Sequence, residues 1–423
     1  MTTLIRAKNL TEFLRGLPRN FKVMMVRDSL ANFIVNMNPY NSLFIFALGA
    51  SGTELGILSS LGLAFSTIFA VLTGWISDRG DKKAIFLLGT AVGVLVPIAY
   101  VLSPSWIWLA VAFILFGVSE GVLQPAWQAM YANSVNDGSR GTVYGLANLF
   151  VMAPILFAGL AGGTIVSAFG GMDADGIRPI YYLQIVLSLA IVAFIWRYLK
   201  PPGRRGQPVP FSFSQMIADY REVLSIDGTR SWVLMKSLGS ISIGLAGPFW
   251  MIYASLVWGA SAMTIAFMVT ARVLTKIVLS PMAGRLTDVY GRKKLILGGR
   301  LMMYVAAVIF LWGGGGWALI LAWVLMGVND STGVAWQAKE VELVGSRQRA
   351  RMTALSIGAF NFLAVPASLL GGYLWDNVGY LAPFIFMILV DGLVRMPIIY
   401  KYIPEAGYEK LNSKQVDPGL FTD

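Results

Sequence analysis

Four ionisable residues fall inside long apolar stretches of the sequence, where their charges could bind a solute or carry a proton: Glu120, Asp330, Arg272 and Lys276. Each stretch approaches the ~20 residues that cross a bilayer as a helix. A charged side chain inside a bilayer is costly, so it usually faces a partner or a water-filled cavity. Because a desolvated carboxylate readily binds a proton, we expect Glu120 and Asp330 to couple proton movement to another process.

Arg272 and Lys276 are both cationic and lie four positions apart, so they share one face of a helix. One interpretation is a cationic site for a carboxylate or phosphate, or a counter-ion for Asp330 or Glu120. The other is a salt bridge that only ties helices together, with Lys276 extending toward the inner surface. The cost of keeping an arginine near the middle of a membrane favours the functional interpretation.

Polar and aromatic residues at helical spacing surround these charges and are candidate substrate contacts. Those that follow Glu120 fall on one helical stripe, and a matching set follows Asp330. For the two tryptophans, packing in a gate is an equally good interpretation, because aromatic rings with a polar edge often fill such interfaces. The candidate contacts are Asn32, Asn36, Tyr40, Gln124, Trp127, Gln128, Trp336 and Gln337.

The composition limits the class of protein. Of the 423 residues 56% are hydrophobic and 13% are charged, which is too little polar surface for a soluble protein of this length. The apolar runs are continuous, which indicates membrane-spanning helices rather than an outer-membrane barrel. The chain has no cysteine and no histidine, so we predict no metal, no cofactor and no enzymatic activity. No nucleotide-binding loop is recognisable, which argues against ATP-driven transport.

Twelve helical spans are predicted from the apolar runs. Pro39 and Pro248 should break or kink the first and seventh of them. Asp391 and Arg395 in the last span are expected to neutralise each other, and Arg300 is interpreted as an inner-end residue. The spans lie near residues 24–48, 54–77, 84–103, 106–131, 141–168, 179–199, 231–258, 262–283, 294–313, 317–338, 351–374 and 380–401.

The connections between spans alternate in charge, with Lys and Arg concentrated in every second one. By the positive-inside rule the basic connections and both termini are cytoplasmic. The net charge of +11 then reflects topology, so we predict no nucleic-acid partner. The expected location is the cell membrane, within the lipid bilayer and as a monomer. The expected divisions are residues 1–23 (N-terminal segment), 24–199 (first bundle), 200–230 (linker with an amphipathic helix), 231–401 (second bundle) and 402–423 (tail).

The tetrapeptide Ala-Trp-Gln-Ala occurs around both Trp127 and Trp336, a shift of 209 positions (336 − 127). At shifts of 209 and 210 many other positions match, including Gly162-Gly163 with Gly371-Gly372 and Glu120 with Asp330. The chain is therefore two parallel repeats of six spans each. The acid and the tryptophan are seven residues apart in the first copy and six in the second. We place the extra residue near Gln124-Pro125, where a bulge could absorb it.

Two basic loops in matching positions carry a family resemblance. "GWISDRGDKK" (74–83) and "GRLTDVYGRKK" (284–294) resemble the signature loop of the major facilitator superfamily, in which a glycine, an aspartate and a basic pair recur. Asp81 stands at a usual glycine in the first copy and Val289 at a usual arginine in the second. The matching residues are Gly74, Asp78, Arg79, Gly284, Asp288, Gly291 and Arg292.

The resemblance implies an all-α fold of twelve transmembrane helices in two six-helix parallel repeats, with spans 1, 4, 7 and 10 lining a central cavity. It also implies that Asp78 faces the start of span 11 and Asp288 the start of span 5, which would close an inner gate. Independently of the family, Gly74 and Gly284 would let neighbouring helices approach closely.

We therefore expect a secondary active transporter. It would move a small organic solute, anionic in character, by rocker-switch alternating access, coupled to protons as a symporter or an antiporter. The alternative is a proton-coupled multidrug-type exporter of amphipathic molecules. The span-5 motif of such exporters is Gly-Pro, two residues and Gly-Gly, and the nearest stretch here, "APILFAGLAGG", departs from it. A membrane enzyme or a sensor is disfavoured, because no nucleophile constellation and no receiver domain is recognisable.

Overall fold

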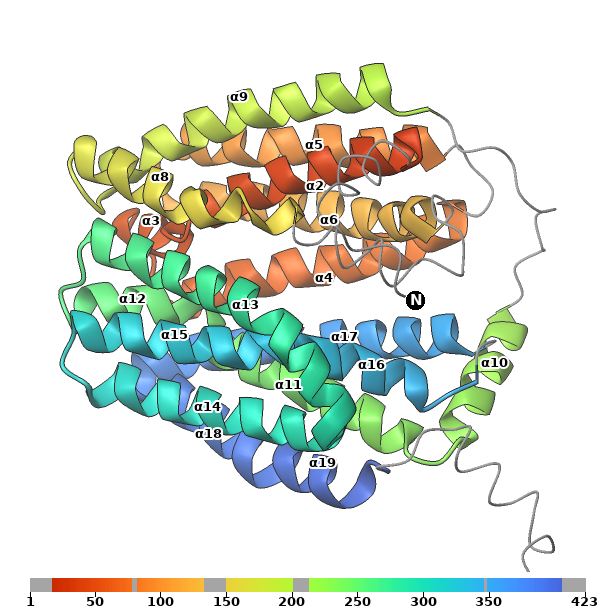
Figure 1. The fold of residues 1–423 in the computed structure, drawn as a ribbon. Coiled ribbons are helices and arrows are strands. Elements are labelled where there is room, and N and C mark those ends of the chain that lie inside the picture. The colour runs from red at the N-terminus through yellow and green to blue at the C-terminus, as the bar shows by residue number, and fades with distance from the viewer. Residues whose placement is uncertain (1–16, 78–81, 133–149, 201–212, 346–347, 405–423) are drawn as a thin grey trace, which may run out of the picture.

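The structure, a computed structural model, describes residues 17–77, 82–132, 150–200, 213–345 and 348–404. These residues form helices and no strand, as expected where lipid leaves backbone groups no other partner. Figure 1 shows two bundles, one containing α2 to α9 and the other α11 to α19. We call the end that carries the basic connections the inner end, and the opposite end the outer end.

The first bundle holds spans 1 to 6. Span 1 consists of two helices that are separated at Asn38-Pro39, where the sequence predicts a break, and short η1 precedes span 4. The elements are α2 (Arg19–Met37), α3 (Asn41–Ala47), α4 (Gly52–Ser77), α5 (Lys82–Leu102), η1 (Trp106–Trp108), α6 (Leu109–Ala132), α8 (Ile155–Ala168) and α9 (Ala174–Tyr198).

The second bundle holds spans 7 to 12, and span 7 changes to a short 3-10 turn at Pro248, as predicted. Its elements are α11 (Thr229–Ala246), η3 (Gly247–Phe249), α12 (Trp250–Leu256), α13 (Ala262–Tyr290), α14 (Arg292–Trp312), α15 (Trp317–Ser331), α16 (Gly333–Glu342), α17 (Arg349–Asn377), α18 (Ala382–Leu389), the π-helix η4 (Val390–Arg395) and α19 (Met396–Tyr402). Helix α10 (Phe213–Ser225) lies in the linker at the inner end of this bundle.

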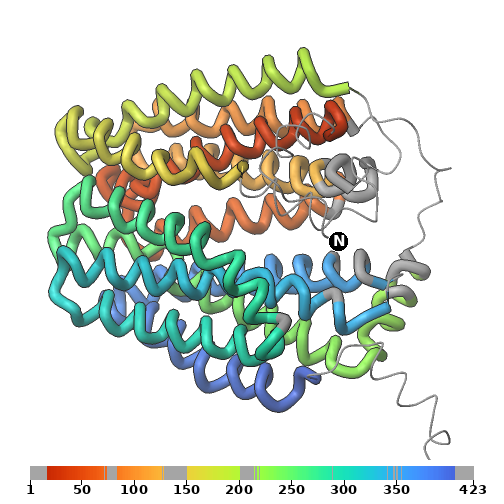
Figure 2. The backbone as a smooth tube through the Cα atoms, in the orientation of Figure 1, coloured from red at the N-terminus to blue at the C-terminus, as the bar shows by residue number. Residues whose placement is uncertain are grey.

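Eleven helical stretches of the described residues are long and apolar enough to cross a membrane. The twelfth span is α2 with α3, whose first residues are charged or polar. The chain thus folds as twelve spans in two six-helix halves, which confirms the predicted fold class. Figure 2 traces the backbone from the first bundle into the second.

The helix interruption in the spans that carry the repeated tetrapeptide lies in the second repeat, not in the first. Span 4 runs through Pro125 as a single α-helix, whereas span 10 is interrupted at Thr332, between α15 and α16. The hydroxyls of Ser331 and Thr332 donate to the carbonyls of Val328 and Asn329, at 2.6 and 2.7 Å. Such local bonds compete with helix propagation. The bulge expected near Gln124-Pro125 was therefore placed in the wrong copy.

The repeated glycine pairs allow close helix contacts both within each half and between the halves. A Cβ atom on Gly162 would overlap the Met37 carbonyl of its own half, and one on Gly163 would lie 2.6 Å from the Ala266 Cβ of the other half. The second copy is equivalent: Gly371 packs on the carbonyl of Leu245, and Gly372 on the carbonyl of Gly52 across the interface. Small residues permit this approach without a favourable hydrophobic driving force in lipid.

Side-chain contacts reinforce this junction toward the outer end. The Asp376 carboxylate accepts from the backbone N–H of Gly52 and Thr53 at 2.9 and 2.7 Å, and from the Thr53 hydroxyl at 2.6 Å. Asp376 thus caps the N-terminus of α4 from the other half, where the helix dipole favours an anion. Deeper in the interface, the Ser60 hydroxyl donates to the Val365 carbonyl at 2.7 Å.

We expect Gly372→Ala to open the outer junction, because the new methyl group would overlap the Gly52 backbone. Overpacking of this kind costs about 1–3 kcal/mol. Since the chain has no cysteine, a single cysteine replacing the buried Ala50 is a clean probe. Its rate of labelling by a maleimide should rise in the variant. Gly358→Ala on the same helix is the control, because a Cβ there meets no atom within 4 Å; equal labelling in both would contradict the prediction.

Candidate functional site

The predicted charges Arg272 and Asp330 form an ion pair inside the second bundle. Arg272 Nε lies 2.7 Å from one Asp330 carboxylate oxygen, and Nη2 lies 3.2 Å from the other. This two-point geometry suits the planar guanidinium and is the strong form of such a pair. The pair is not sealed, because the Arg272 side chain is 42% exposed and that of Asp330 is 22% exposed.

Helices α13 and α15 bring these two residues together through a glycine. A Cβ on Gly327 would lie 2.5 Å from the Arg272 carbonyl oxygen and 2.8 Å from the Thr275 Cβ. Gly327 stands three residues before Asp330, so the close approach sets the carboxylate beside the arginine. Next to it, the Asn329 side-chain oxygen is buried without a hydrogen-bond partner among the described residues.

The first half has the same helix contact but a different charge. Gly117 packs on the Gly62 carbonyl, and these residues match Gly327 and Arg272 at the 210-residue shift. Glu120, the counterpart of Asp330, therefore faces a glycine position instead of an arginine. Its described contact is with the Gln124 amide, 3.4 Å away. Within the described residues, no Lys or Arg lies within 4 Å of its carboxylate.

Lys276 lies one turn beyond Arg272 on α13 and is half-buried. No carboxylate of the described part of the chain lies within 4 Å of its ammonium. The second half thus carries a paired arginine with an additional cation, and the first half carries an acid. The two repeats therefore differ at the candidate site in the charges that they carry.

The remaining candidate contacts are divided between exposed and engaged side chains. Asn32, Gln124 and Gln337 are exposed. The Asn32 and Asn36 amides donate to carbonyls one turn earlier on their own helix, both at 2.8 Å. Tyr40 is fully buried, and its hydroxyl donates to the Ala262 carbonyl of the other half at 2.8 Å. The side chain of Gln128 lies outside the described residues.

Trp127 is held by a carboxylate at the inner end of the first bundle. Its indole N–H donates to Asp28 at 2.8 Å, and Asp28 also pairs with Arg27 at 3.0 Å. The Arg27 guanidinium lies 5.2 Å from the ring centroid of Phe86. This arrangement connects span 1 to span 4.

The second bundle makes the equivalent connection with the roles exchanged. Trp232 on span 7 donates to Glu340 on span 10 at 3.0 Å, and Lys236, the counterpart of Arg27, lies 3.3 Å from the same carboxylate. The repeated Trp336 packs on the Trp232 ring, with centroids 5.9 Å apart, and under the Arg395 guanidinium at 4.7 Å. The two copies of the tetrapeptide therefore lie on matching helices but make different contacts.

The signature-loop residues are only partly within the described structure. Asp78 and Arg79 lie outside it, as do the side chain of Asp288 and the surroundings of Gly74. Gly291 has φ of +89°, a conformation that favours glycine at the start of α14. Arg292 pairs with Glu342 of α16 within its own half. At Gly284 no close helix approach occurs among the described residues, because a Cβ there would meet none of their atoms within 4 Å.

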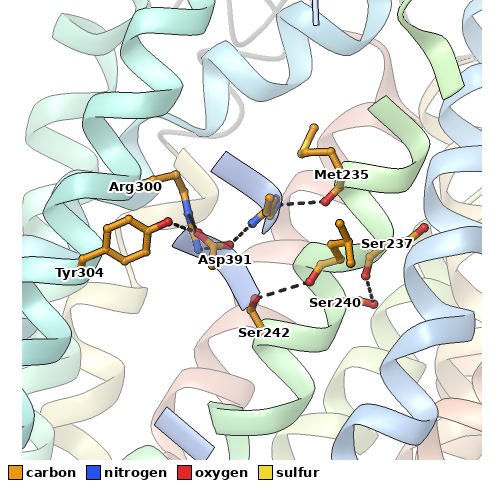
Figure 3. A network of polar contacts seen from close by, with 9 residues as sticks. Met235, Ser237, Ser240, Ser242, Arg300, Tyr304 and Asp391 are labelled. Carbon is orange, nitrogen blue, oxygen red and sulfur yellow. Dashed lines mark hydrogen bonds and ion pairs between the residues drawn. The ribbon is translucent and has the colours of Figure 1, made fainter. Parts of the chain in front are cut away.

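Sequence reasoning missed a buried ionic cluster in the second bundle (Figure 3). Asp391 is fully buried, and Arg300 of α14 binds it at 2.6 and 2.9 Å. Arg395 donates to it at 2.9 Å and the Tyr304 hydroxyl at 2.5 Å. The expected Asp391–Arg395 pair is present, but Arg300 is a buried partner and not an inner-end residue. The i, i+4 spacing could not show that a second helix supplies another arginine.

This cluster is positioned by the backbone around it. The π-helix η4 carries both Asp391 and Arg395, and Arg395 also donates to the Met235 carbonyl of α11 at 3.0 Å. A Cβ on Gly239 would lie 2.7 Å from the Arg395 guanidinium, so the glycine leaves the space that this side chain occupies. The cluster joins spans 7, 9 and 12 and supports Trp336 of span 10.

No group of three or more His, Cys, Asp or Glu side chains that could hold a metal ion occurs among the described residues. A family profile for the Major Facilitator Superfamily matches residues 29–264 and 232–418. The chain belongs to this superfamily. It is accordingly a transporter and not an enzyme, and it works in a lipid bilayer on small-molecule substrates.

Individual relatives are distant. The multidrug resistance protein MdtG of Dickeya zeae is 22% identical over 69% of this chain and 71% of its own length. For MdtG of Yersinia enterocolitica the identity is 27%, and the match spans only 38% of this chain and 39% of that relative. A crystal structure of a mutant of the nucleoside transporter NupG has a TM-score of 0.72 at 11% identity, covering 90% of this chain and 99% of that chain. At this identity the likeness shows the fold.

We expect Asp391→Asn to destabilise the second bundle, because it leaves Arg300 and Arg395 without a compensating charge. Removing one member of a buried ion pair costs about 3–5 kcal/mol. Thermal unfolding of the purified protein, followed by tryptophan fluorescence, should shift down by several degrees. Asp227→Asn, at an exposed position, is the control. Adding Arg300→Gln to Asp391→Asn should restore part of the loss; a double variant less stable than Asp391→Asn would contradict this account.

Proposed function

We propose that the protein is a proton-coupled secondary transporter of a small organic anion, and that Arg272 binds the anionic group. The observation that carries the proposal is the two-point Arg272–Asp330 pair, which is partly exposed although it lies within membrane-spanning helices. Solvent weakens the attraction within a partly exposed pair, so its members separate more easily than those of a buried pair. An exposed guanidinium can exchange its carboxylate for that of a substrate.

The proposed coupling mechanism is a competition between Asp330 and the substrate for Arg272. While Asp330 is ionised, it occupies the guanidinium and competes with an anionic substrate. Protonation of Asp330 removes the competing charge, so that Arg272 becomes available and the proton and the substrate bind together. Of the two coupling modes that the sequence leaves open, this competition favours symport. Lys276, one turn away, would add to the attraction for a carboxylate or phosphate.

Other candidate residues take supporting roles in this proposal. The exposed Asn32, Gln124 and Gln337 are suited to hydrogen-bond the uncharged part of a substrate, together with Asn36 and Gln128. Tyr40 and the tryptophans Trp127 and Trp336 would instead fix the helices around it. Asp376 and Tyr40 hold the two halves together at the outer end.

Alternation to the opposite state would use the signature loops as an inner gate. We assign this role to Gly74, Asp78, Arg79, Gly284, Asp288, Gly291 and Arg292, with Asp78 facing the start of span 11. The protein would lie in the cell membrane as a monomer with both termini in the cytoplasm. The basic connections support this orientation.

The coupling mechanism predicts opposite effects for the two members of the pair. A thermal-shift screen of organic acids, sugars, amino acids, peptides and hydrophobic cations would first identify a stabilising anion. Asp330→Asn should then bind that anion about tenfold more tightly, because Arg272 loses its competitor. In proteoliposomes with an imposed pH gradient, however, this variant should fail to accumulate the anion. Exchange of labelled for unlabelled anion should persist.

Arg272→Ala should abolish binding and flux, while Lys294→Ala, which removes an exposed inner-end charge of the same sign, should not. The reversed pair Arg272→Asp/Asp330→Arg separates the interpretations. If the reversed pair transports normally, the residues only tie helices together, and the anion site is excluded.

A second candidate function, export of amphipathic cations driven by protons, is favoured by the MdtG relatives and by Glu120. Glu120 has no described cationic partner and adjoins the exposed Gln124. In this case Glu120→Gln should abolish ethidium efflux from cells, whereas Asp175→Asn, at an exposed outer position, should leave it intact. Efflux that is unchanged by Glu120→Gln would remove this alternative.

A further inference from the structure

A groove opens at the inner end of the first bundle, whereas the Arg272–Asp330 pair lies in the second bundle. It has a volume of about 340 Å³ and lies between the start of α2 and the end of α9. Its walls combine apolar side chains with two cations, and none of the residues that line it is acidic. The lining residues are Leu17, Arg19, Lys22, Val23, Val26, Phe194 and Tyr198.

Further positive charge lies at the rim. The Arg197 guanidinium is 5.7 Å from the ring centroid of Tyr198. Asn20 joins the two helices here, since its amide donates to the Lys200 carbonyl at 2.9 Å and its side-chain oxygen accepts from the Lys200 N–H at 3.0 Å. The start of span 1 is thereby fixed to the end of span 6, with cations on both sides of a shallow apolar surface.

The second half fills the matching place with its own chain. At the 209-residue shift, Val23 and Val26 correspond to Trp232 and Met235, which are fully buried beside Val223 of the linker helix α10 and Ile403. Arg19 corresponds to Gly228, where a Cβ would lie 2.6 Å from Pro404. Among the described residues, the matching place in the second half is therefore filled and is not a cationic groove.

We propose that this groove binds an anionic phospholipid of the inner leaflet. Arg19 and Lys22 would hold the headgroup phosphate, and an acyl chain would lie along Val26, Phe194 and Tyr198. Basic pockets between membrane helices on the cytoplasmic side bind anionic headgroups of this kind. None of the residues that line the groove is acidic, so an anionic headgroup matches its charge.

The test compares two lipids with identical acyl chains and different headgroups. Full-length protein in mixed micelles would be titrated with dioleoyl-phosphatidylglycerol or dioleoyl-phosphatidylcholine, and bound lipid counted by native mass spectrometry. We expect tighter binding of phosphatidylglycerol, and a loss of about tenfold in Arg19→Gln/Lys22→Gln, because each cation near the surface contributes to the attraction. Lys294→Gln/Lys401→Gln is the control, since it removes two exposed inner-end cations of the other half.

A second variant tests the apolar wall without altering charge. Val26→Phe narrows the groove and should also reduce phosphatidylglycerol binding, with thermal unfolding unchanged in the absence of lipid. Equal losses in the two charge variants would reduce the effect to general surface attraction and overturn the site. If deletion of residues 1–16 raises lipid binding while Arg19→Gln/Lys22→Gln does not change it, the segment is the occupant and the proposal is wrong.

Discussion

A charge within the bilayer must be compensated, and this constraint separates the two halves of the protein. The helix packing is shared: Gly117 and Gly327 make the same contact, as do the glycine pairs of spans 5 and 11. The charges are not shared, because Arg272 stands where the first half has a glycine. Asp330 consequently has a cation beside it, and Glu120 has none among the described residues. A duplicated scaffold has therefore acquired two different electrostatic environments at one pair of matching positions.

Compensation takes two forms in the second half, and they imply different roles. The Asp391 carboxylate receives two arginines and a tyrosine and is fully buried, so its partners cannot exchange without exposing charge to a low dielectric. The Arg272–Asp330 pair has similar geometry but remains accessible. An accessible pair can be opened by a proton or an anion at modest cost. Under the proposed function, rigidity and exchange belong to two separate ionic groups of the second bundle.

The sequence predicts the architecture well because its signals are long and repeated. Apolar runs, alternating basic connections and the 209-residue shift each report on many residues, and the breaks at Pro39 and Pro248 follow from proline chemistry. Features that depend on single residues were harder to predict from the sequence. The interruption of span 10 depends on the hydroxyls of Ser331 and Thr332, which the comparison of spacings could not distinguish from an insertion at Pro125. The burial of Arg300 could not be predicted because its partner, Asp391, lies 91 positions away in the sequence.

The divergence of the inner ends follows the same logic as that of the charged pair. Trp127 and Trp336 lie on matching helices. In the first half Trp127 of span 4 donates to Asp28 of span 1, whereas in the second half Trp232 of span 7 donates to Glu340 of span 10. A tryptophan–carboxylate hydrogen bond between spans 1 and 4, or between spans 7 and 10, holds the two helices together whichever of them carries the acid. Exchanging the roles preserves the scaffold while changing which surface each tryptophan presents. In the second half this frees Trp336 to pack on Arg395, so that the buried ionic cluster reaches one of the helices that carry the candidate site.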